Sequence, residues 1–415
     1  MAEFAVAMRT LGCKVNRVEA EKVTAQLLGS GVRVVGERDA SVVIVTTCTV
    51  TAEADHKARK AVRHALNLPQ APIVVVSGCL AAIDPDGLAA LGERVVVEAD
   101  TDAVAARVAA LLGTSVGDRL TGPRVGDAFR TRAVVKVEDG CDAFCAYCIV
   151  PYARGVPRSV PLAEVVAEVS SLVDAGVAEI VLTGINIGRY TDSGADLPGL
   201  IEAVAATGVR RLRVSSIEPG DVSERFLAVA ARVPSFCAHI HVPLQAGCDR
   251  TLSAMGRTYD TAAYASVLTR IRDAFPGAAI TTDVLTGFPG ESDVDFDRTL
   301  TFVRACGFSR LHVFRYSPRT GTPAAVMAEK VPVAVKSERA RRLRALDADL
   351  RARFAEAHVG SDAEVLVERL GDDGMAEGTT REYLRVIMQG RGLAEGDVVT
   401  AHLAGVERGR MTAAW

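Results

Sequence analysis

Long apolar runs, a recognisable secretion signal and a strong charge imbalance are all missing from this chain of 415 residues. Its apolar runs, such as Ile73-Val-Val-Val76, have the length of a strand and are far too short to cross a bilayer. The segment Met1-Ala-Glu-Phe4 has no basic stretch followed by an apolar core, so we expect no signal peptide. The formal net charge is only −3, so any nucleic-acid surface must be local. We expect a cytoplasmic protein with no membrane association.

The composition is that of a globular protein whose cysteines remain unpaired. Hydrophobic residues make up 49% of the chain and charged residues 24%, which is ordinary for a folded protein. The length predicts two or three domains, each with its own core. Nine cysteines without a secretion signal favour a reducing compartment and metal ligation over disulfides.

The most informative motif is Gly140-Cys-Asp-Ala-Phe-Cys-Ala-Tyr-Cys-Ile149, in which Cys141, Cys145 and Cys148 have the spacing Cys-x3-Cys-x2-Cys. Three thiolates so close together can hold three corners of a cubane iron–sulfur cluster. The fourth iron then stays open to a reacting molecule, much as a catalytic zinc ion keeps one position for its substrate. A structural zinc site is the main alternative, but such a site uses four ligands, usually in two separated pairs. A chance group of buried thiols is the other alternative.

Residues 1–115 alternate short β-rich runs with helical patterns. Apolar runs at 4–8, 42–45 and 73–76 are typical of buried parallel strands, and helical patterns lie between them at 18–28 and 52–66. This alternation predicts a flavodoxin-like, doubly wound parallel sheet. Residues 116–131 are rich in glycine and turn formers and are predicted to be a linker.

The strand–helix alternation restarts in the central part, residues 132–335. Six strands are predicted there, at 134–137, 180–182, 212–214, 240–242, 280–284 and 311–314. Six such units indicate a partial (β/α)6 barrel, an opened version of the (β/α)8 barrel.

The C-terminal part begins with a basic linking helix at 336–355. Its core at 336–353 carries seven basic and three acidic residues, with an apolar seam of Leu343, Leu346 and Leu350. Residues 356–415 then change to short β runs with turns, which predicts a small β-barrel. Eleven acidic and six basic residues in this segment run against a simple basic RNA-binding patch. Attraction to phosphate would have to come from the helix and local arginines, unless the helix is only a solvated, salt-bridged element.

A second set of cysteines follows the first three predicted strands. Cys13, Cys48 and Cys79 lie in Thr10-Leu-Gly-Cys13, Val45-Thr-Thr-Cys48 and Val76-Ser-Gly-Cys79. Because the carboxyl ends of parallel strands open on one edge of a sheet, these thiols can converge. Three small buried residues are the alternative. We expect a second metal cluster here, and only packing roles for Cys237, Cys248 and Cys306.

With these motifs in this order, the chain resembles the radical SAM methylthiotransferases nearly from end to end. The motifs that carry the resemblance are Thr10-Leu-Gly-Cys-Lys-Val-Asn16, Thr47-Cys-Thr-Val-Thr51, Ser77-Gly-Cys79, Gly140-Cys to Cys148-Ile-Val-Pro-Tyr-Ala-Arg-Gly155, His241-Val-Pro-Leu-Gln245, Gly287-Phe-Pro-Gly-Glu291 and Tyr316-Ser-Pro-Arg-Thr-Gly-Thr322. The tail with Glu377-Gly-Thr-Thr-Arg-Glu-Tyr383 is similar to TRAM, an RNA-binding β-barrel domain.

Within that family, Gly12-Cys-Lys-Val-Asn16 is most like the enzymes that act on N6-threonylcarbamoyladenosine (t6A) next to the anticodon of tRNA. The resemblance implies two 4Fe-4S clusters, S-adenosylmethionine (SAM) and tRNA as partners, and a cellular electron donor and sulfur source. The cluster of Cys141, Cys145 and Cys148 would generate the 5′-deoxyadenosyl radical, and the second cluster would carry sulfur to C2 of the adenine. The product would be the 2-methylthio derivative.

The resemblance also implies a SAM pocket at the carboxyl ends of the barrel strands. The candidates that follow the predicted strands there are Thr183, Gly184, Asn186, Ser215, Glu218, His241, Gln245 and Asp283. A plain turn, a helix cap, a structural histidine or a satisfied strand-end carboxylate would also explain these residue types. The chain departs from the family pattern at Thr46, Asp139, Ala246 and Cys248, and none of these departures removes a proposed iron ligand.

Three other functions stay open. The acceptor can be isopentenyladenosine in tRNA or an aspartate of a ribosomal protein. From another class, the chain can be a non-catalytic iron–sulfur regulator that binds RNA, or an electron carrier.

Overall fold

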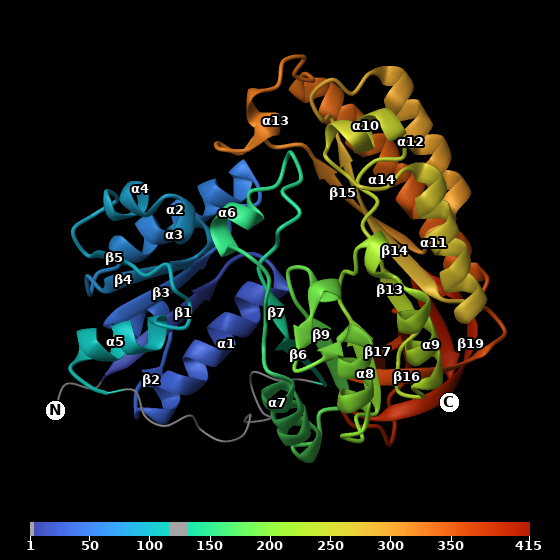
Figure 1. Cartoon of the computed structure of the whole chain (residues 1–415). Coiled ribbons are helices and arrows are strands. Elements are labelled where there is room, and N and C mark those ends of the chain that lie inside the picture. Colours follow the sequence, from blue (N-terminus) through green and yellow to red (C-terminus); the bar gives the residue numbers. More distant parts are fainter. Residues whose placement is uncertain (1–3, 116–130) are drawn as a thin grey trace. The chain divides into compact units, whose positions relative to one another are not determined.

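Figure 1 shows the computed structural model of the chain, which describes residues 4–115 and 131–415. Its contacts divide it into two compact units. The first unit comprises the described residues of Met1–Pro123 together with Gly140–Val156 and Ser317–Ala325. The second comprises the described residues of Arg124–Asp139, with Pro157–Tyr316 and Val326–Trp415. The predicted linker lies outside the described residues except for Thr131, and the predicted domain boundaries stay predictions.

The first unit is built on a five-stranded parallel sheet in the order β2-β1-β3-β4-β5. Its strands are β1 (Ala5–Thr10), β2 (Arg33–Val34), β3 (Val42–Thr47), β4 (Ile73–Gly78) and β5 (Val95–Val97). The strands predicted at 4–8, 42–45 and 73–76 correspond to β1, β3 and β4. The order 2-1-3-4-5 is that of flavodoxin-like folds, so the predicted doubly wound sheet is confirmed.

Both faces of this sheet are covered by helices. The helical elements of the unit are α1 (Lys14–Gly29), η1 (Glu37–Asp39), α2 (Ala52–Leu66), α3 (Cys79–Ile83), α4 (Pro85–Ala89), α5 (Val104–Leu112) and α6 (Val150–Arg154). On one face Val43 and Val74 pack with Val62 of α2. On the other face Ile44 and Val75 pack with helices α1 and α5. The unbroken apolar runs that begin β3 and β4 are what a sheet buried on both faces requires.

The second unit contains a curved sheet of six parallel strands. They are β6 (Arg132–Lys136), β9 (Glu179–Thr183), β12 (Arg211–Val214), β13 (His239–His241), β14 (Ala279–Thr286) and β15 (Arg310–Arg315). Two three-stranded sheets, β12-β9-β6 and β13-β14-β15, are joined by the bridge between Ser216 and His241. All six predicted strands are present, which confirms the partial (β/α)6 barrel.

Neighbouring connecting helices pack against one another along this sheet (Figure 1). The helical elements are α7 (Leu162–Asp174), η2 (Ile187–Arg189), α8 (Leu197–Ala205), η3 (Pro219–Asp221), α9 (Glu224–Arg232), α10 (Asp249–Ala254), α11 (Thr261–Ala274) and α12 (Asp293–Cys306). Short strands complete this part: β7 (Glu138–Asp139), β8 (Arg158–Ser159), β10 (Thr191–Asp192) and β11 (Ala195–Asp196). Leu212 and Val214 belong to the core under the helices, so Arg211 and Arg213 face the barrel interior.

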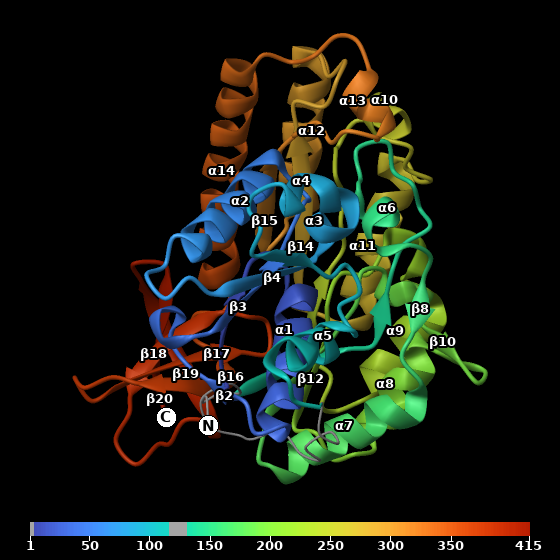
Figure 2. The same ribbon diagram turned by 90° about the vertical axis from the view of Figure 1, so that its left-hand side faces the viewer.

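The basic helix and the C-terminal barrel complete the second unit. Helix α14 (Val333–Glu356) is longer than the predicted 336–355, and its seam of Leu343, Leu346 and Leu350 is buried as expected. A short helix, α13 (Pro323–Val326), precedes it. The strands that follow form a closed barrel in the order β16-β17-β18-β20-β19 (Figure 2): β16 (Asp362–Leu370), β17 (Met375–Thr380), β18 (Arg385–Gln389), β19 (Val398–Glu407) and β20 (Arg410–Ala414). The predicted small β-barrel is therefore confirmed.

Within the two described stretches, no helix combines the length and apolar character needed to span a membrane.

Candidate functional site

The first three cysteines lie at one edge of the N-terminal sheet. Cys13 caps the start of α1, three residues beyond the end of β1. Cys48 directly follows β3, and Cys79 is the first residue of α3 directly after β4. Because these strands are parallel, all three residues follow carboxyl ends on the same edge.

The thiols of these cysteines are close enough to affect one another. Burial, above all, raises the pKa of Cys48, and the proximity of Cys13 raises it further. Burial likewise raises the pKa of Cys79 to about 11, while Arg154 beside it acts in the opposite direction. A metal that binds here must therefore displace protons from two buried thiols.

Two glycines allow the cysteine loops to approach each other. Gly12 has φ +108°, and a Cβ there would lie 2.7 Å from the Cβ and 3.3 Å from the Sγ of Cys48. Gly78 has φ +90°, and a Cβ there would lie 2.5 Å from the carbonyl oxygen of Thr47. Neither position accepts a side chain without moving a strand end that carries a cysteine.

Asn16 and Arg154 connect the loops around this site. The fully buried amide of Asn16 donates to the carbonyl oxygens of Leu11 and Thr47, both at 2.8 Å. Arg154 donates through Nη2 to Asn16 Oδ1 at 2.7 Å and through Nε to the Sγ of Cys79 at 3.2 Å. Its Nη1 also pairs with Glu19 at 2.9 Å, and both side chains are only 6% exposed. Sequence reasoning missed this role for Arg154.

The second cysteine trio lies in an irregular loop that belongs to the same unit. Cys141, Cys145 and Cys148 lie between β7 and α6, outside any helix or strand. The backbone N–H of Cys141 donates to Gly155 at 2.9 Å, and that of Cys148 to Cys145 at 2.9 Å. Cys145 is buried, whereas the other two are half-buried. Backbone hydrogen bonds therefore hold the loop in shape, while the side chains of Cys141 and Cys148 stay partly exposed.

The donor sets of both trios fit a cluster better than a structural zinc ion. Each trio offers three cysteine thiols, and Cys thiolates are the ligands that hold iron–sulfur clusters. A structural zinc site uses four protein ligands, which is one more than either trio supplies. Three thiolates around a cubane cluster leave one iron open, so the residues present fit that group.

An open pocket of about 420 Å³ adjoins Cys13 on the first unit. Lys14, Arg17 and Glu21 contribute to its lining, and Arg17 pairs with Glu21 at 2.8 Å. The pocket therefore presents charges of both signs beside the exposed cysteine.

In the second unit, the predicted SAM-pocket residues lie at or just beyond the carboxyl ends of the barrel strands. Thr183 is the last residue of β9, and Ser215 directly follows β12. His241 is the last residue of β13 and Asp283 lies within β14. The remaining candidates occupy the following loops: Gly184, Asn186, Glu218 and Gln245. The backbone of Gln245 has φ +69° and pairs with β14 through Asp283 and Leu285.

Three buried polar atoms of this rim form no hydrogen bond with any described residue of the protein. In the described part of the chain, the Oδ1 of Asn186, the Oγ of Ser215 and the Oε1 of Glu138 are buried and form no hydrogen bond. Groups of this kind are costly to leave unsatisfied unless another molecule completes them. The methionine and ribose groups of SAM are chemically suited to do so.

Glu138 is a site residue that sequence reasoning missed. It is fully buried, and its Oε2 accepts the backbone N–H of Asn186 at 2.7 Å. Burial raises the pKa of its carboxyl to about 7. Its place three residues before Cys141 was the available signal, but the sequence does not show that this side chain turns toward Gly184, where an added Cβ would meet it at 2.7 Å.

Glu218 forms an ion pair within the protein. Its carboxylate pairs with Arg257, whose guanidinium also lies 4.9 Å from the ring centre of Tyr259. Burial raises the pKa of Glu218, and Arg257 opposes that rise. Any contact of Glu218 with a ribose would therefore use an oxygen already oriented by Arg257.

His241 and Asp283 meet a third residue, His312 of β15, which sequence reasoning did not include. The Oδ1 of Asp283 lies 3.3 Å from Nε2 of His241 and 3.3 Å from Nδ1 of His312. The two imidazole rings stack with their centres 5.1 Å apart. Burial opposes ionisation of Asp283, but the two histidines outweigh it and lower its pKa to about 2. Three adjacent strands thus present a charged carboxylate between two imidazoles.

The basic helix is less available to phosphate than its composition suggests. Arg339 is buried and pairs with Glu291 at 2.7 Å and with Asp293 at 2.8 Å. Three more arginines of α14 also form ion pairs: Arg341, Arg342 and Arg351. These four arginines are therefore engaged in salt bridges, as the alternative of a solvated, salt-bridged helix expects, and do not form a phosphate-binding face.

Comparison with known proteins places this geometry in a family. Residues 135–303 match the family model of the radical SAM superfamily, and residues 5–98 match a model described as uncharacterized protein family UPF0004. A threonylcarbamoyladenosine tRNA methylthiotransferase of Bacillus subtilis is 36% identical over 409 residues, covering 93% of this chain and 90% of the relative. The chain belongs to the radical SAM methylthiotransferase family. It is therefore an enzyme of the transferase class.

Other relatives show how the family is divided. The Thermotoga maritima threonylcarbamoyladenosine tRNA methylthiotransferase is 36% identical over 391 residues, covering 92% of this methylthiotransferase and 90% of the relative. A tRNA-2-methylthio-N6-dimethylallyladenosine synthase of Sphingopyxis alaskensis is 32% identical over 417 residues, covering 95% and 94%. The relatives of this chain are thus named for two different modified nucleosides of tRNA.

Solved structures support the fold alone. The radical SAM methyltransferase TsrM of Kitasatospora setae, solved with cobalamin and a [4Fe-4S] cluster, superposes with a TM-score of 0.58 at 16% identity. The aligned part covers 79% of this methylthiotransferase and 77% of that chain.

Proposed function

We propose that this methylthiotransferase converts t6A in tRNA to its 2-methylthio derivative, with C2–H replaced by C2–S–CH3. The observation that carries the proposal is the end-to-end similarity to relatives named for that reaction, at 36% identity over nine-tenths of both chains. The six cysteines that the motif analysis singled out supply the chemistry, and they lie in one compact unit.

Each cysteine trio has a distinct role in this proposal. Cys141, Cys145 and Cys148 would hold the 4Fe-4S cluster that, with SAM, supplies the 5′-deoxyadenosyl radical. Cys13, Cys48 and Cys79 would hold a second cluster that carries the sulfur. For the reaction to balance, one SAM would give its methyl group to a sulfide-level sulfur and leave as S-adenosylhomocysteine. The other, cleaved with one electron, would give methionine and a 5′-deoxyadenosyl radical, which takes the C2 hydrogen and becomes 5′-deoxyadenosine. Attachment of the methylated sulfur to the C2 radical would return that electron, and one proton is released overall.

Residues of the barrel rim would bind and orient SAM. Asn186 and Ser215 offer unsatisfied oxygens, and Glu138 offers a carboxylate oxygen that can accept from the methionine ammonium. Thr183, Gly184 and Gln245 belong to the same rim. Arg154 would donate to a sulfur ligand of the second cluster, which helps to set its charge and potential.

The polarity of the barrel interior favours t6A over an isopentenylated adenosine. His239, His241, Thr281, Asp283 and His312 occupy alternate positions on three adjacent strands and so face the interior. The threonylcarbamoyl group carries a carboxylate, a hydroxyl and amides that such side chains can hydrogen-bond. An isopentenyl group has no polar atom with which to extend the hydrogen bonds that these side chains already make with one another.

The remaining partners follow from the reaction. The open pocket beside Cys13 would admit a small sulfur source to the second cluster. A cellular electron donor would reduce the SAM-binding cluster. The C-terminal barrel would contact the tRNA, in keeping with its similarity to TRAM, and the protein would act in the cytoplasm.

The test is a mass analysis of tRNA nucleosides. A strain lacking the gene should lose 2-methylthio-t6A and accumulate t6A, while its 2-methylthio-isopentenyladenosine stays constant. The wild-type gene should restore the product, and Cys145→Ala should not. An unchanged t6A pool in the deletion strain would refute the proposal.

The same strains and the purified protein separate the alternatives. Loss of the methylthio group from isopentenyladenosine instead would favour the function named for the Sphingopyxis relative. Anaerobically reconstituted protein should form 5′-deoxyadenosine from SAM and a reductant, and its failure to do so with full iron content would favour a non-catalytic role.

A further inference from the structure

The turn between β17 and β18 of the C-terminal barrel meets the parallel barrel at the amino ends of its strands. Arg132, Glu179 and Arg211 are the first residues of β6, β9 and β12, and they lie opposite one another in register. Arg213 lies one layer further into the interior. The contact is therefore at the mouth opposite the strand ends that carry the proposed SAM pocket.

Glu179 is the shared anion of this contact. Its Oε1 lies 2.9 Å from Nε of Arg213, and its Oε2 lies 2.8 Å from Nε of Arg211. Arg132 pairs with the same carboxylate. The side chains of Glu179, Arg211 and Arg213 have no exposed area. Burial opposes ionisation of Glu179, but the three guanidinium groups outweigh it and lower its pKa.

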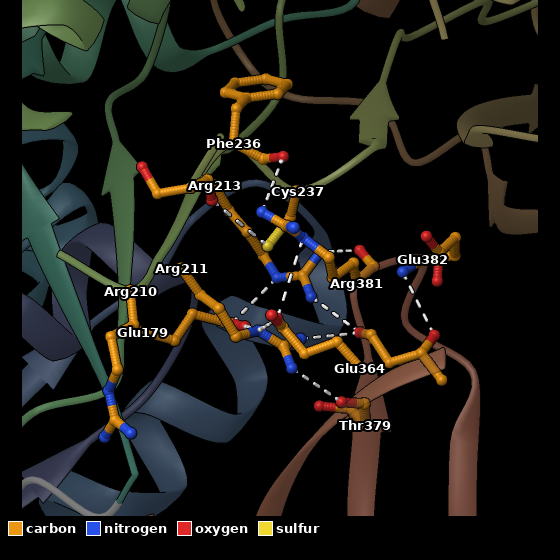
Figure 3. A network of polar contacts seen from close by, with 12 residues as sticks. Glu179, Arg210, Arg211, Arg213, Phe236, Cys237, Glu364, Thr379, Arg381 and Glu382 are labelled. Carbon is orange, nitrogen blue, oxygen red and sulfur yellow. Dashed lines mark hydrogen bonds and ion pairs between the residues drawn. The ribbon is translucent and has the colours of Figure 1, made fainter. Parts of the chain in front are cut away.

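The turn supplies the acceptors that these buried arginines need. Arg211 donates to the carbonyl oxygens of Thr379 at 3.0 Å and Thr380 at 2.8 Å. Arg213 donates to Thr380 at 2.9 Å and Arg381 at 2.5 Å. Figure 3 shows both arginines pointing toward this part of the C-terminal barrel, with Arg381 reaching back. Without the turn, four buried N–H groups would lose their partners, which a folded protein does not tolerate cheaply.

Tyr383 carries the contact further into the barrel. Its ring centre lies 3.8 Å from the guanidinium carbon of Arg213, and its ring meets that of His239 edge to face at 4.5 Å. Tyr383 also has φ +64°, a left-handed backbone that a residue with a bulky side chain adopts only when its surroundings hold it there. The ring of Tyr383 is therefore held in place against the ring of His239.

A short chain of polar contacts leads from His239 to the proposed SAM pocket. Nε2 of His239 lies 3.3 Å from the Oγ1 of Thr281, and the same hydroxyl lies 2.8 Å from Nδ1 of His241. Nε2 of His241 in turn faces Asp283 at 3.3 Å. The hydroxyl of Thr281 thus connects His239, which contacts Tyr383, to His241 in the proposed SAM pocket.

We propose that the turn at 380–384 closes the amino-terminal mouth of the parallel barrel, and that Tyr383 is a positioning residue for the SAM pocket through His239 and Thr281. The C-terminal domain is then a structural part of the SAM-binding unit as well as a surface for RNA. This inference rests on the proposed SAM pocket but is independent of which nucleoside is modified.

The experiment measures SAM affinity and tRNA affinity separately in anaerobic, iron-loaded protein. Tyr383→Ala should raise the Kd and the KM for SAM about tenfold, since small displacements of positioning groups have effects of this size or larger. Tyr383→Phe keeps the ring and should behave as wild type. Thr281→Val removes only the bridging hydroxyl and should also weaken SAM binding, although it leaves the turn intact.

Arg391→Ala is the matched control, because Arg391 is an exposed residue of another loop of the C-terminal barrel. It should leave SAM binding unchanged whatever it does to tRNA binding. Wild-type Kd and KM for SAM in Tyr383→Ala would overturn the inference, whatever the change in tRNA binding, and so would wild-type values in Thr281→Val. If the alanine variant fails to fold, Thr281→Val alone decides, since unchanged SAM binding there removes the polar chain from the argument. Wild-type protein that binds SAM but never modifies t6A would refute the proposed function only.

Discussion

Replacing Glu179 by glutamine should destabilise the second unit strongly. The substitution keeps the shape of the side chain but removes the charge shared by Arg132, Arg211 and Arg213. Breaking a buried ion pair by removing one partner costs about 3–5 kcal/mol. At about 2–4 °C per kcal/mol for a unit of this size, the melting temperature should fall by about 10 °C. Iron bound by the first unit should be unaffected.

Thermal melting of anaerobic protein at pH 7 and at lower pH tests this reasoning. The pKa of Glu179 is lowered from the ordinary value of 4.5, so its contribution is complete above that pH and is lost as the pH falls through the folded-state pKa. The gap between wild type and Glu179→Gln should therefore be widest near neutrality and narrow in acid. Glu202→Gln is the control, since it breaks an exposed pair with Arg232 at 3.7 Å. A Glu179→Gln protein that melts together with this control would refute the reasoning.

Three further predictions concern the cluster site and the SAM pocket. Arg154→Gln removes a donor to the Sγ of Cys79, so the midpoint potential of the second cluster should fall at constant iron content, as measured by a redox titration followed by EPR; an unchanged potential would contradict it. Gly78→Ala places a Cβ 2.5 Å from a carbonyl oxygen of β3, so iron analysis should show that the first unit loses iron. The control is Gly176→Ala: Gly176 has a similar φ of +89°, but an added Cβ would lie in open space, so this variant should keep the iron content of the wild type. For Glu138, burial raises the pKa to about 7, so its neutral form favours folding in acid, and this contribution is lost as the pH rises from the ordinary 4.5 through 7. Between pH 5 and pH 8 the melting temperature should fall less in Glu138→Gln than in the wild type. Equal falls would argue against a buried neutral carboxyl.

The strands and the N-terminal cysteines could be predicted because they depend on local pattern and one topological rule. Runs such as Ile73-Val-Val-Val76 fit only a strand buried on both faces, and parallel strands bring their carboxyl ends together. Cys48 and Cys79 therefore converge although 31 residues separate them in the sequence. The (β/α)6 barrel was predictable for the same reason.

Partners fixed only by tertiary packing could not be predicted. Arg154 is 75 residues from Cys79, and a single arginine after a proline-containing turn gives no sign of its partner. The strand predicted at 212–214 gives no sign of buried arginines, yet its register turns Arg211 and Arg213 inward. There Glu179 neutralises their charge and the C-terminal turn accepts their hydrogen bonds. His312 was missed because only the register of β15 against β14 places it opposite Asp283.

The amide of Asn16 has a consequence for how the enzyme matures. By bonding to the carbonyl groups at Leu11 and Thr47, it ties together the ends of two strands through atoms that are not metal ligands. A zinc finger gains its fold from its ion, whereas these two bonds add to the stability of the first unit with or without a cluster. Iron starvation should therefore destabilise this unit less than the loss of zinc destabilises a zinc finger.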